Sequence, residues 1–253
     1  MNLQNWNEPL SHSIRRGAGR ATGDFSMISE GDRVLVGLSG GKDSLVLLHA
    51  LSELRRRSPV RFDLAACTVA LTGMDVSHLR DYCAVREVPY IVLSHPITEI
   101  IESRKERSPC SFCANMRRGI LNSKAREEGF NRLALGHNLD DAVETFFMNL
   151  FRAGRARSFQ PKLYQTRMGI TVIRPLIYVR ESAIVEEARR LRLPILETTC
   201  PWAGKTERHR MKVMLNEMRK EIPGLFSSVV NALCSLSGED RWPAEQHGRN
   251  KRK

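Results

Sequence analysis

VLVGLSGGKDSLVLLHAL, residues 34–51, decides the fold, because it sets a glycine-rich polar segment between two apolar runs. The first run, ending at Leu38, is typical of a buried strand, and the second predicts a helix that starts near Ser44. At a helix start the unpaired backbone N–H groups and the helix dipole favour an anion. The segment therefore predicts a phosphate-binding turn in an α/β protein.

The polar segment SGGKDS is not spaced like the common Walker loop, because no glycine directly precedes the lysine at the required distance from Gly37. Adjacent glycines let the backbone wrap closely around a ligand, two serines add hydroxyl groups, and a lysine adds charge. A plain Gly-Gly turn is the alternative, but it needs none of these side chains. We expect the anion to lie against residues Leu38, Ser39, Gly40, Gly41, Lys42, Asp43 and Ser44.

The rest of the chain repeats the order strand then helix. Apolar runs at 61–71, 90–94 and 131–137 predict further strands, with helices at 76–88 and 139–154. After Arg155 a polar stretch continues to residue 167, and an extended segment follows at 169–178. This alternation predicts a doubly wound, mostly parallel sheet with a ligand crevice at the carboxyl ends of its strands. We expect helical additions at both ends of the chain, so that residues 1–30 form an N-terminal extension, 31–237 the main domain and 238–253 a disordered basic tail.

Composition narrows the class of protein. The chain has 253 residues, 42% of them hydrophobic, and charged residues or glycines interrupt its longest apolar runs. These runs are too short for a membrane span, and residues 1–20 lack the apolar core of a signal peptide, so we expect a cytoplasmic protein with no membrane partner. Forty Lys and Arg against 28 Asp and Glu, a net charge of +12, favour a nucleic-acid partner, although a basic solubility bias is the alternative.

Six cysteines in a chain without an export signal indicate metal or redox chemistry rather than disulfides. Cys110 and Cys113 form a CxxC on the connection after the third strand, just before a basic helix at 114–129. Alone it is ambiguous between zinc, redox and iron–sulfur chemistry. Together with Cys200 in a distant loop it would suit a 4Fe-4S cluster whose open iron could bind sulfide. The other three cysteines are expected to pack as small hydrophobes: Cys67, Cys83 and Cys234.

A third motif, LALGHNLDDAVETFFMNLFRAG at 133–154, predicts a strand that runs into a helix. Gly136 permits a tight exit from the strand. Polar residues then crowd the helix start: His137, Asn138, Asp140 and Asp141. Helix capping explains one of them, whereas carboxylates beside a bound triphosphate can hold Mg²⁺ or act as acid or base. A doubly capped helix start remains the alternative.

SGGKDS, CSFC followed by MRRGIL, GHNLDD, the VIRPL segment and Cys200 together resemble the tRNA 2-thiocytidine synthetase family of PP-loop ATP pyrophosphatases, over about Phe25 to Leu233. The resemblance implies the PP-loop fold of the adenine nucleotide alpha hydrolase-like class. In that family ATP is cleaved between its α- and β-phosphates, and an anticodon-loop cytidine is adenylated at its 2-carbonyl oxygen. Sulfide carried by a 4Fe-4S cluster then replaces the oxygen, and AMP is released.

The resemblance assigns roles residue by residue. ATP would lie on residues 38–44 with Gly136 and His137, the cluster on Cys110, Cys113 and Cys200, and catalysis or Mg²⁺ binding on Lys42, Asp43, Asp140 and Asp141. We expect Arg117, Arg118, Arg152 and Arg155 to contact tRNA. The implied cofactors are ATP, Mg²⁺ and the 4Fe-4S cluster, and the implied partners are tRNA and a sulfur donor, either a cysteine desulfurase or sulfide. Related enzymes are often dimers, so a homodimer is compatible with the resemblance.

Two other functions fit part of the pattern. A PP-loop ligase of the tRNA lysidine synthetase type shares the glycine loop but has no need of the three cysteines. A non-catalytic sensor that binds ATP or an iron–sulfur cluster together with RNA would need the basic surface but not the acidic helix start. Related 2-thiouridine enzymes carry N-terminal zinc-binding cysteines, and the absence of any cysteine before Cys67 speaks against that branch.

Overall fold

The computed structural model describes residues 3–106, 108–196 and 207–235. Its contacts divide the chain into two units. The first comprises residues 1–142 and 159–207 and contains the sheet. The second comprises residues 143–158 and 208–253 and, where described, is helical. The domain limits expected at residues 30 and 237 stay predictions, and the expected tail at 238–253 lies outside the described residues.

The sheet of the first unit has six strands in the order β3-β2-β1-β4-β6-β5. Every neighbouring pair is parallel except β5 with β6, so the mostly parallel sheet expected from the sequence is confirmed. The strand bounds are β1 Asp32–Gly37, β2 Phe62–Ala70, β3 Tyr90–Ser94, β4 Arg132–Ala134, β5 Lys162–Gln165 and β6 Ile170–Ile173.

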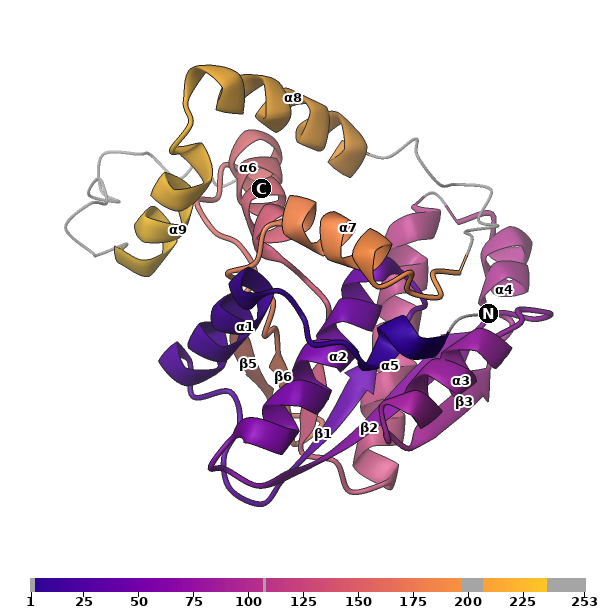
Figure 1. Ribbon diagram of the computed structural model, residues 1–253. Helices are drawn as coiled ribbons and strands as arrows, with labels where there is room; N and C mark the ends of the chain where they lie inside the picture. The colour runs from indigo at the N-terminus through magenta and orange to yellow at the C-terminus, as the bar shows by residue number, and fades with distance from the viewer. Residues whose placement is uncertain (1–2, 107, 197–206, 236–253) are drawn as a thin grey trace. The chain divides into compact units, whose positions relative to one another are not determined.

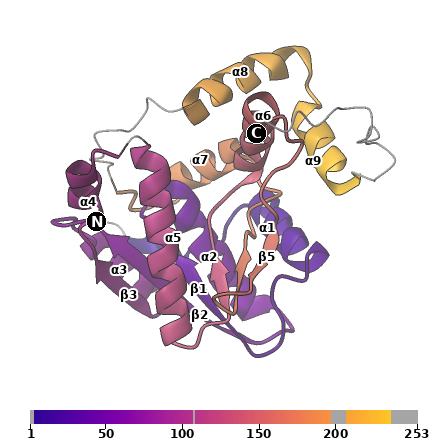
Figure 2. The same ribbon diagram turned by 180° about the vertical axis from the view of Figure 1, so that it is seen from behind.

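Helices cover both faces of the sheet (Figures 1 and 2). In β1, Val34 and Val36 belong to one hydrophobic cluster and Leu35 to the other, because successive side chains of a strand point to opposite faces. The first cluster includes side chains of α1, α2, α3 and α7, and the second those of α4 and α5. The helix bounds are α1 His12–Asp24, α2 Lys42–Arg57, α3 Ser77–Val85, α4 Ile97–Arg104, α5 Pro109–Glu127 and α7 Glu181–Arg190.

Two elements were not expected from the sequence. Strand β5 lies in the segment 156–167 that its polar composition indicated as irregular; it is a four-residue edge strand in which Tyr164 is 60% exposed. Helix α4 occupies part of the long connection after β3 and starts directly after Pro96. The expected extended segment at 169–178 forms a strand only as far as Ile173, because Pro175 cannot donate a hydrogen bond to the sheet.

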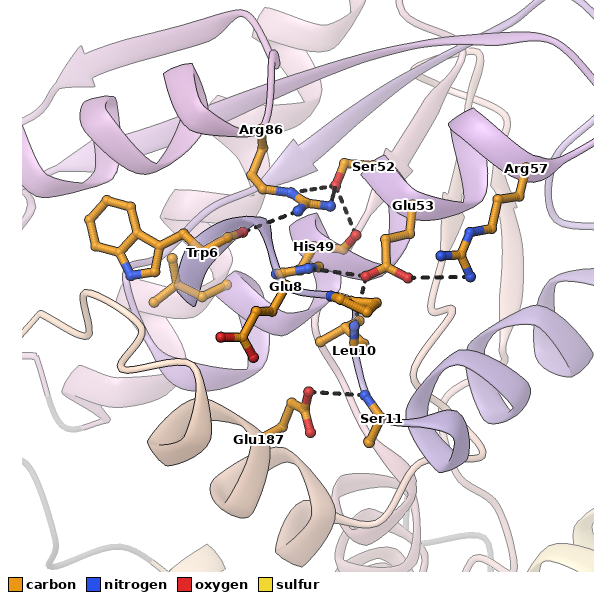
Figure 3. A network of polar contacts seen from close by, with 12 residues as sticks. Trp6, Glu8, Leu10, Ser11, His49, Ser52, Glu53, Arg57, Arg86 and Glu187 are labelled. Carbon is orange, nitrogen blue, oxygen red and sulfur yellow. Dashed lines mark hydrogen bonds and ion pairs between the residues drawn. The ribbon is translucent and has the colours of Figure 1, made fainter. Parts of the chain in front are cut away.

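The N-terminal segment, a short 3-10 helix at Leu3–Asn7 and the residues up to Ser11, is bound to the rest of the first unit by a polar network (Figure 3). The buried guanidinium of Arg86 donates to the Ser52 hydroxyl at 2.6 Å and to the Trp6 carbonyl at 3.1 Å. The backbone N–H of Leu10 donates to Glu53 at 2.7 Å, and that of Ser11 to Glu187 at 3.0 Å. Helices α2 and α7 and the residue that follows α3 therefore share one set of contacts with this segment.

Helix α6, Leu139–Ala153, begins in the first unit and continues into the second, which also holds most of α8, Glu207–Glu221, and α9, Leu225–Ser235. Within the second unit, Arg208 donates to the Thr145 hydroxyl at 3.3 Å. Leu225, Phe226 and Val229 are the buried residues of α9. Over the described ranges, no helix is both long and apolar enough to span a membrane.

Candidate functional site

The SGGKDS segment joins the carboxyl end of β1 to the start of α2. Its hydroxyls close the turn: Ser44 Oγ donates to the Gly41 carbonyl at 2.9 Å and accepts from Ser39 N at 3.2 Å. Gly40 has φ +82°, a conformation that favours glycine. No side chain caps α2. The N–H groups of its first turn therefore lie at the carboxyl end of β1 without a side-chain cap, as an anion site would require.

Gly136, at the exit of β4, lies against this turn. A Cβ atom at this position would stand 3.0 Å from the Asp43 carbonyl carbon and 3.0 Å from Ser44 N. Both are backbone atoms, which cannot move aside as a flexible side chain could. Glycine is therefore required here so that the β4 exit can approach the start of α2, which agrees with the tight strand exit expected from the sequence.

Lys42 binds two carboxylates. Its Nζ atom donates to Asp43 Oδ2 at 2.9 Å and lies 2.9 Å from Oε1 of Glu181, the first residue of α7. Burial favours a lower pKa for Lys42, but the two carboxylates outweigh it and raise its pKa. Lys42 is therefore charged and held in place. Sequence reasoning missed Glu181, because its partner is 139 positions away in the chain.

The two carboxylates at the start of α6 have different contacts. Asp141 and Asn138 cap the helix reciprocally: Asn138 N donates to Asp141 Oδ2 and Asp141 N donates to Asn138 Oδ1, each at 3.0 Å. The Asn138 amide also donates to Asp43 Oδ1 at 2.8 Å. Asn138 therefore links the third motif to the glycine loop. The sequence indicated Asn138 as one of the crowded polar residues but gave it no role.

Asp140 forms a two-pronged ion pair with Arg180. Nε and Nη2 of Arg180 each donate to one carboxylate oxygen at 3.0 Å, and the backbone N–H of Glu181 adds a third bond at 2.8 Å. These contacts tie the start of α6 to the start of α7. Catalytic or Mg²⁺ roles for Asp140 and Asp141 stay predictions, because both carboxylates already have structural partners.

Aromatic and basic side chains follow the ends of β4 and β6. The ring of His137 lies 5.0 Å from that of Phe159, and the guanidinium of Arg174 lies 4.8 Å from the same Phe159 ring. Arg174 is 5% exposed and donates to the Gln160 carbonyl at 2.6 Å. Burial lowers the pKa of Arg174 to about 10, and the charge of Arg118 adds to the effect. Arg174 lies in the VIRPL segment, which contributed to the family resemblance but did not indicate these contacts of Arg174.

The CxxC lies in the first turn of α5, which starts at Pro109, and not on the connection before the helix as expected. Proline at a first helical position is favoured, so the helix starts earlier than the basic run at 114–129 indicated. Cys110 is exposed and Cys113 is half-buried. Positions three apart share a helix face, so this pair offers two accessible thiols to an iron–sulfur cluster.

The third expected ligand, Cys200, lies outside the described residues. Inside them, no group of three or more His, Cys, Asp or Glu side chains could hold a metal ion. The described part of the chain thus holds two of the three expected thiols. Their type and spacing fit the cluster that the sequence indicated.

The remaining cysteines have two different environments. Cys67 and Cys83 are fully buried, and burial raises the pKa of each thiol to about 12, so both pack as small hydrophobes as expected. For Cys234 the expectation was wrong, because this residue is exposed. It lies in the last turn of α9, beyond the buried residues of that helix, so its helical position alone did not imply burial.

The four arginines expected to contact tRNA are divided between the units. Arg117 and Arg118 lie on α5 in the first unit, where Arg118 donates to Asn115 Oδ1 at 2.8 Å. Arg152 lies in the last turn of α6 and Arg155 two residues beyond its end, both in the second unit and both exposed. Their contacts with tRNA stay predictions.

Known proteins resemble this chain both in sequence and in fold. Residues 11–217 match the PP-loop domain family. The chain is 40% identical over 237 residues to a tRNA-cytidine(32) 2-sulfurtransferase of Geobacter metallireducens, covering 90% of this chain and 91% of that one. It is 41% identical over 235 residues to the enzyme of the same name from Syntrophotalea carbinolica, covering 90% of each. Among solved structures it resembles the U34-tRNA thiolase NcsA from Methanococcus maripaludis with its [4Fe-4S] cluster, at TM-score 0.71 and 26% identity, over 89% of this chain and 79% of that one.

Proposed function

Because the chain belongs to the PP-loop domain family and, within it, to the tRNA-cytidine(32) 2-sulfurtransferases, we propose that it replaces the 2-oxygen of an anticodon-loop cytidine in tRNA by sulfur. The enzyme uses ATP and releases AMP and pyrophosphate. One observation supports this most directly: the SGGKDS turn, with an uncapped helix start behind it, is joined by Gly136 and Asn138 to the acidic start of α6.

The first step activates the cytidine. Its 2-oxygen attacks the α-phosphorus of ATP, a P–O bond to the β-phosphate breaks, and pyrophosphate leaves. The N–H groups at the start of α2 and the charge of Lys42 stabilise the departing pyrophosphate. Glu181 and Asp43 hold the Lys42 ammonium in position for this role.

The second step exchanges oxygen for sulfur. Sulfide attacks carbon 2 of the adenylated base, and the C–O bond then breaks so that AMP leaves with the original oxygen. Cys110 and Cys113, with Cys200, would hold the 4Fe-4S cluster. When bound, this cluster supplies an iron that can keep sulfide available beside the substrate. Mg²⁺ accompanies ATP and shields its phosphate charge.

Further parts of the proposal concern partners. The sulfur donor is a cysteine desulfurase or free sulfide, and the protein acts in the cytoplasm, where a homodimer is compatible with its family. A lysidine-type ligase and a non-catalytic sensor are less favoured, because the relatives at 40% and 41% identity are both named as sulfurtransferases.

A reconstitution experiment tests the function. The protein is purified without oxygen, its iron content and visible absorption are recorded, and unmodified tRNA, ATP, Mg²⁺ and sulfide are added. Mass spectrometry of the digested tRNA should show 2-thiocytidine, with AMP formed in equal amount. Lysine is included in a parallel mixture, so lysidine in place of 2-thiocytidine, or ATP binding without any pyrophosphate release, would overturn the proposal.

A further inference from the structure

The end of α6 carries an exposed aromatic ring next to a group of arginines. Phe151 is 54% exposed, although phenylalanine is a residue that folding normally buries. Arg152, Arg155 and Arg157, all exposed, follow within six residues. All four residues belong to the second unit.

The ring of Phe151 is held by other rings. Its centroid lies 5.5 Å from that of Phe147, which in turn lies 5.4 Å from Phe146 in an edge-to-face arrangement. Phe147 is buried. One side of Phe151 therefore packs on the helix, and this contact limits the freedom of the ring. A ring that is braced from behind and open to solvent can stack on a flat ligand at a small entropy cost.

The arginines lie on a turn that hydrogen bonds hold in place. Gly154 ends the helix with φ +59°, and its N–H donates to the Leu150 carbonyl at 3.2 Å. Asn149 then binds the turn twice: its carbonyl accepts from Arg155 N at 3.1 Å, and its side-chain amide donates to the Arg157 carbonyl at 2.9 Å. Asn149 is therefore a positioning residue for this turn.

The charge of this region favours an anion. Over residues 143–158 and 208–235 the second unit has eight Lys and Arg against three Glu. Neither Arg155 nor Arg157 forms an ion pair with a described residue. Proteins that bind unpaired RNA combine aromatic rings that stack on bases with arginines that neutralise phosphates.

Resting on the proposed function, we propose that the end of α6 is a binding site for unpaired nucleotides of the tRNA substrate. Phe151 stacks on an unstacked base, and Arg155 and Arg157, held by Asn149, contact the phosphates beside it. The site thus selects single-stranded loop RNA over paired RNA, because only an unpaired base can leave its neighbours and lie on the ring.

Binding measurements on the full-length protein test this inference. The probes are an anticodon stem-loop RNA and a fully paired duplex of the same length, measured by fluorescence anisotropy. F151A should bind the stem-loop about tenfold more weakly and the duplex as the wild type does, while F151W should retain binding. Y164A, which removes a similarly exposed ring from β5, is the matched control and should bind as the wild type does.

The arginines are tested through salt. R155A/R157A should weaken binding of both RNAs and make the slope of log affinity against log salt less steep by about 1.4. R16A/R61A replaces two exposed arginines outside this site and should leave both the affinity and the slope unchanged. Unchanged stem-loop binding by F151A, or an equal loss for duplex and stem-loop, would overturn the inference. So would a change in oligomeric state of F151A with unaltered RNA affinity, which would assign the surface to a protein contact.

The outcomes separate this inference from the proposed function. A wild-type protein that binds the stem-loop through Phe151 but forms no 2-thiocytidine would contradict only the proposed function. A wild-type protein that thiolates tRNA, with F151A equal to it in affinity and rate, would contradict only the site at the end of α6. Thermal melting of each variant shows that a loss of binding does not come from unfolding.

Discussion

Glu181 Oε1 lies 2.9 Å from Lys42 Nζ, so the first residue of α7 contacts the only lysine of the glycine loop. The backbone N–H of Glu181 also donates to Asp140 at the start of α6. One residue therefore contacts both sequence motifs that were expected to bind ATP. Helix α7 carries no recognisable motif, but its first residue helps to hold the site in place.

Replacing Glu181 by Gln should weaken the use of ATP. A charge-assisted hydrogen bond is worth roughly 1.5–3 kcal/mol, so loss of the carboxylate should lower kcat/KM for ATP in the thiolation reaction by about tenfold or more. Glu186→Gln changes an exposed carboxylate of the same helix and should act as the wild type does. Equal activity of the two variants would show that Glu181 does not position Lys42.

Replacing Gly136 by Ala should damage both stability and ATP binding. The added Cβ would stand 3.0 Å from two backbone atoms of the loop, so the β4 exit must move away from the start of α2 at a cost of about 1–3 kcal/mol. Gly19→Ala in α1 meets nothing within 4 Å and should stabilise the protein by about 0.5–1 kcal/mol. Urea unfolding and ATP titration measure both effects, and a G136A protein as stable as the wild type would refute the packing argument.

The sheet and the loop could be predicted from the sequence because local patterns encode them. Apolar strands followed by amphipathic helices indicated the parallel order, and SGGKDS indicated the phosphate turn. Glu181, Arg180 and Arg174 could not be found in this way. Each acts through a partner outside its own helix or strand, at least 14 positions away in the chain. A charged residue at a helix start or after a strand looks the same whether it faces solvent or a buried site. Exposed β5 lacked any alternation that would mark a strand.

Variants of Asp140 and Arg180 can distinguish a structural role of the ion pair from a catalytic role of Asp140. If the ion pair is structural, Asp140→Asn and Arg180→Gln should each lower the free energy of unfolding by roughly 1.5–3 kcal/mol, and the double variant should lose less than the sum. Thiolation rates should then fall in parallel for both single variants. A much larger loss of kcat in D140N than in R180Q, at equal stability, would instead assign a catalytic role to Asp140.

The cysteine pair should be needed for iron but not for ATP. Cys110→Ser or Cys113→Ser removes a thiol from the first turn of α5, so each should lose bound iron and thiolation while ATP affinity stays within about twofold, because neither residue belongs to the loop. Cys234→Ser removes another exposed thiol and is the matched control. Iron analysis after anaerobic purification decides the point: full iron content in C110S and C113S would exclude these two ligands.

The N-terminal segment is attached through a buried histidine on α2. His49 Nδ1 lies 2.9 Å from the Tyr82 hydroxyl. Nε2 of His49 lies 3.1 Å from the Glu53 carboxylate that accepts the Leu10 N–H (Figure 3). Burial lowers the pKa of His49, and the charge of Arg86 adds to this, against the opposing effect of Glu53. The folded protein therefore holds His49 neutral.

Stability should consequently fall in mild acid. The unfolded chain protonates His49 near its ordinary pKa of 6.5, whereas the folded protein does so only at lower pH. The stability that comes from neutral His49 is therefore present above pH 6.5 and is lost as the pH falls below it. Between pH 7 and pH 5 the free energy of unfolding should drop, by at most about 1.4 kcal/mol per pH unit from this one group. Burial favours a higher pKa for Glu53, but its contacts with His49 and Leu10 outweigh burial and lower its pKa. The stability that ionised Glu53 contributes is therefore lost only as the pH falls below its ordinary pKa of 4.5. Urea unfolding at several pH values should show the drop in the wild type and a flatter profile in His49→Gln, and equal slopes for the two proteins would contradict the assignment to His49.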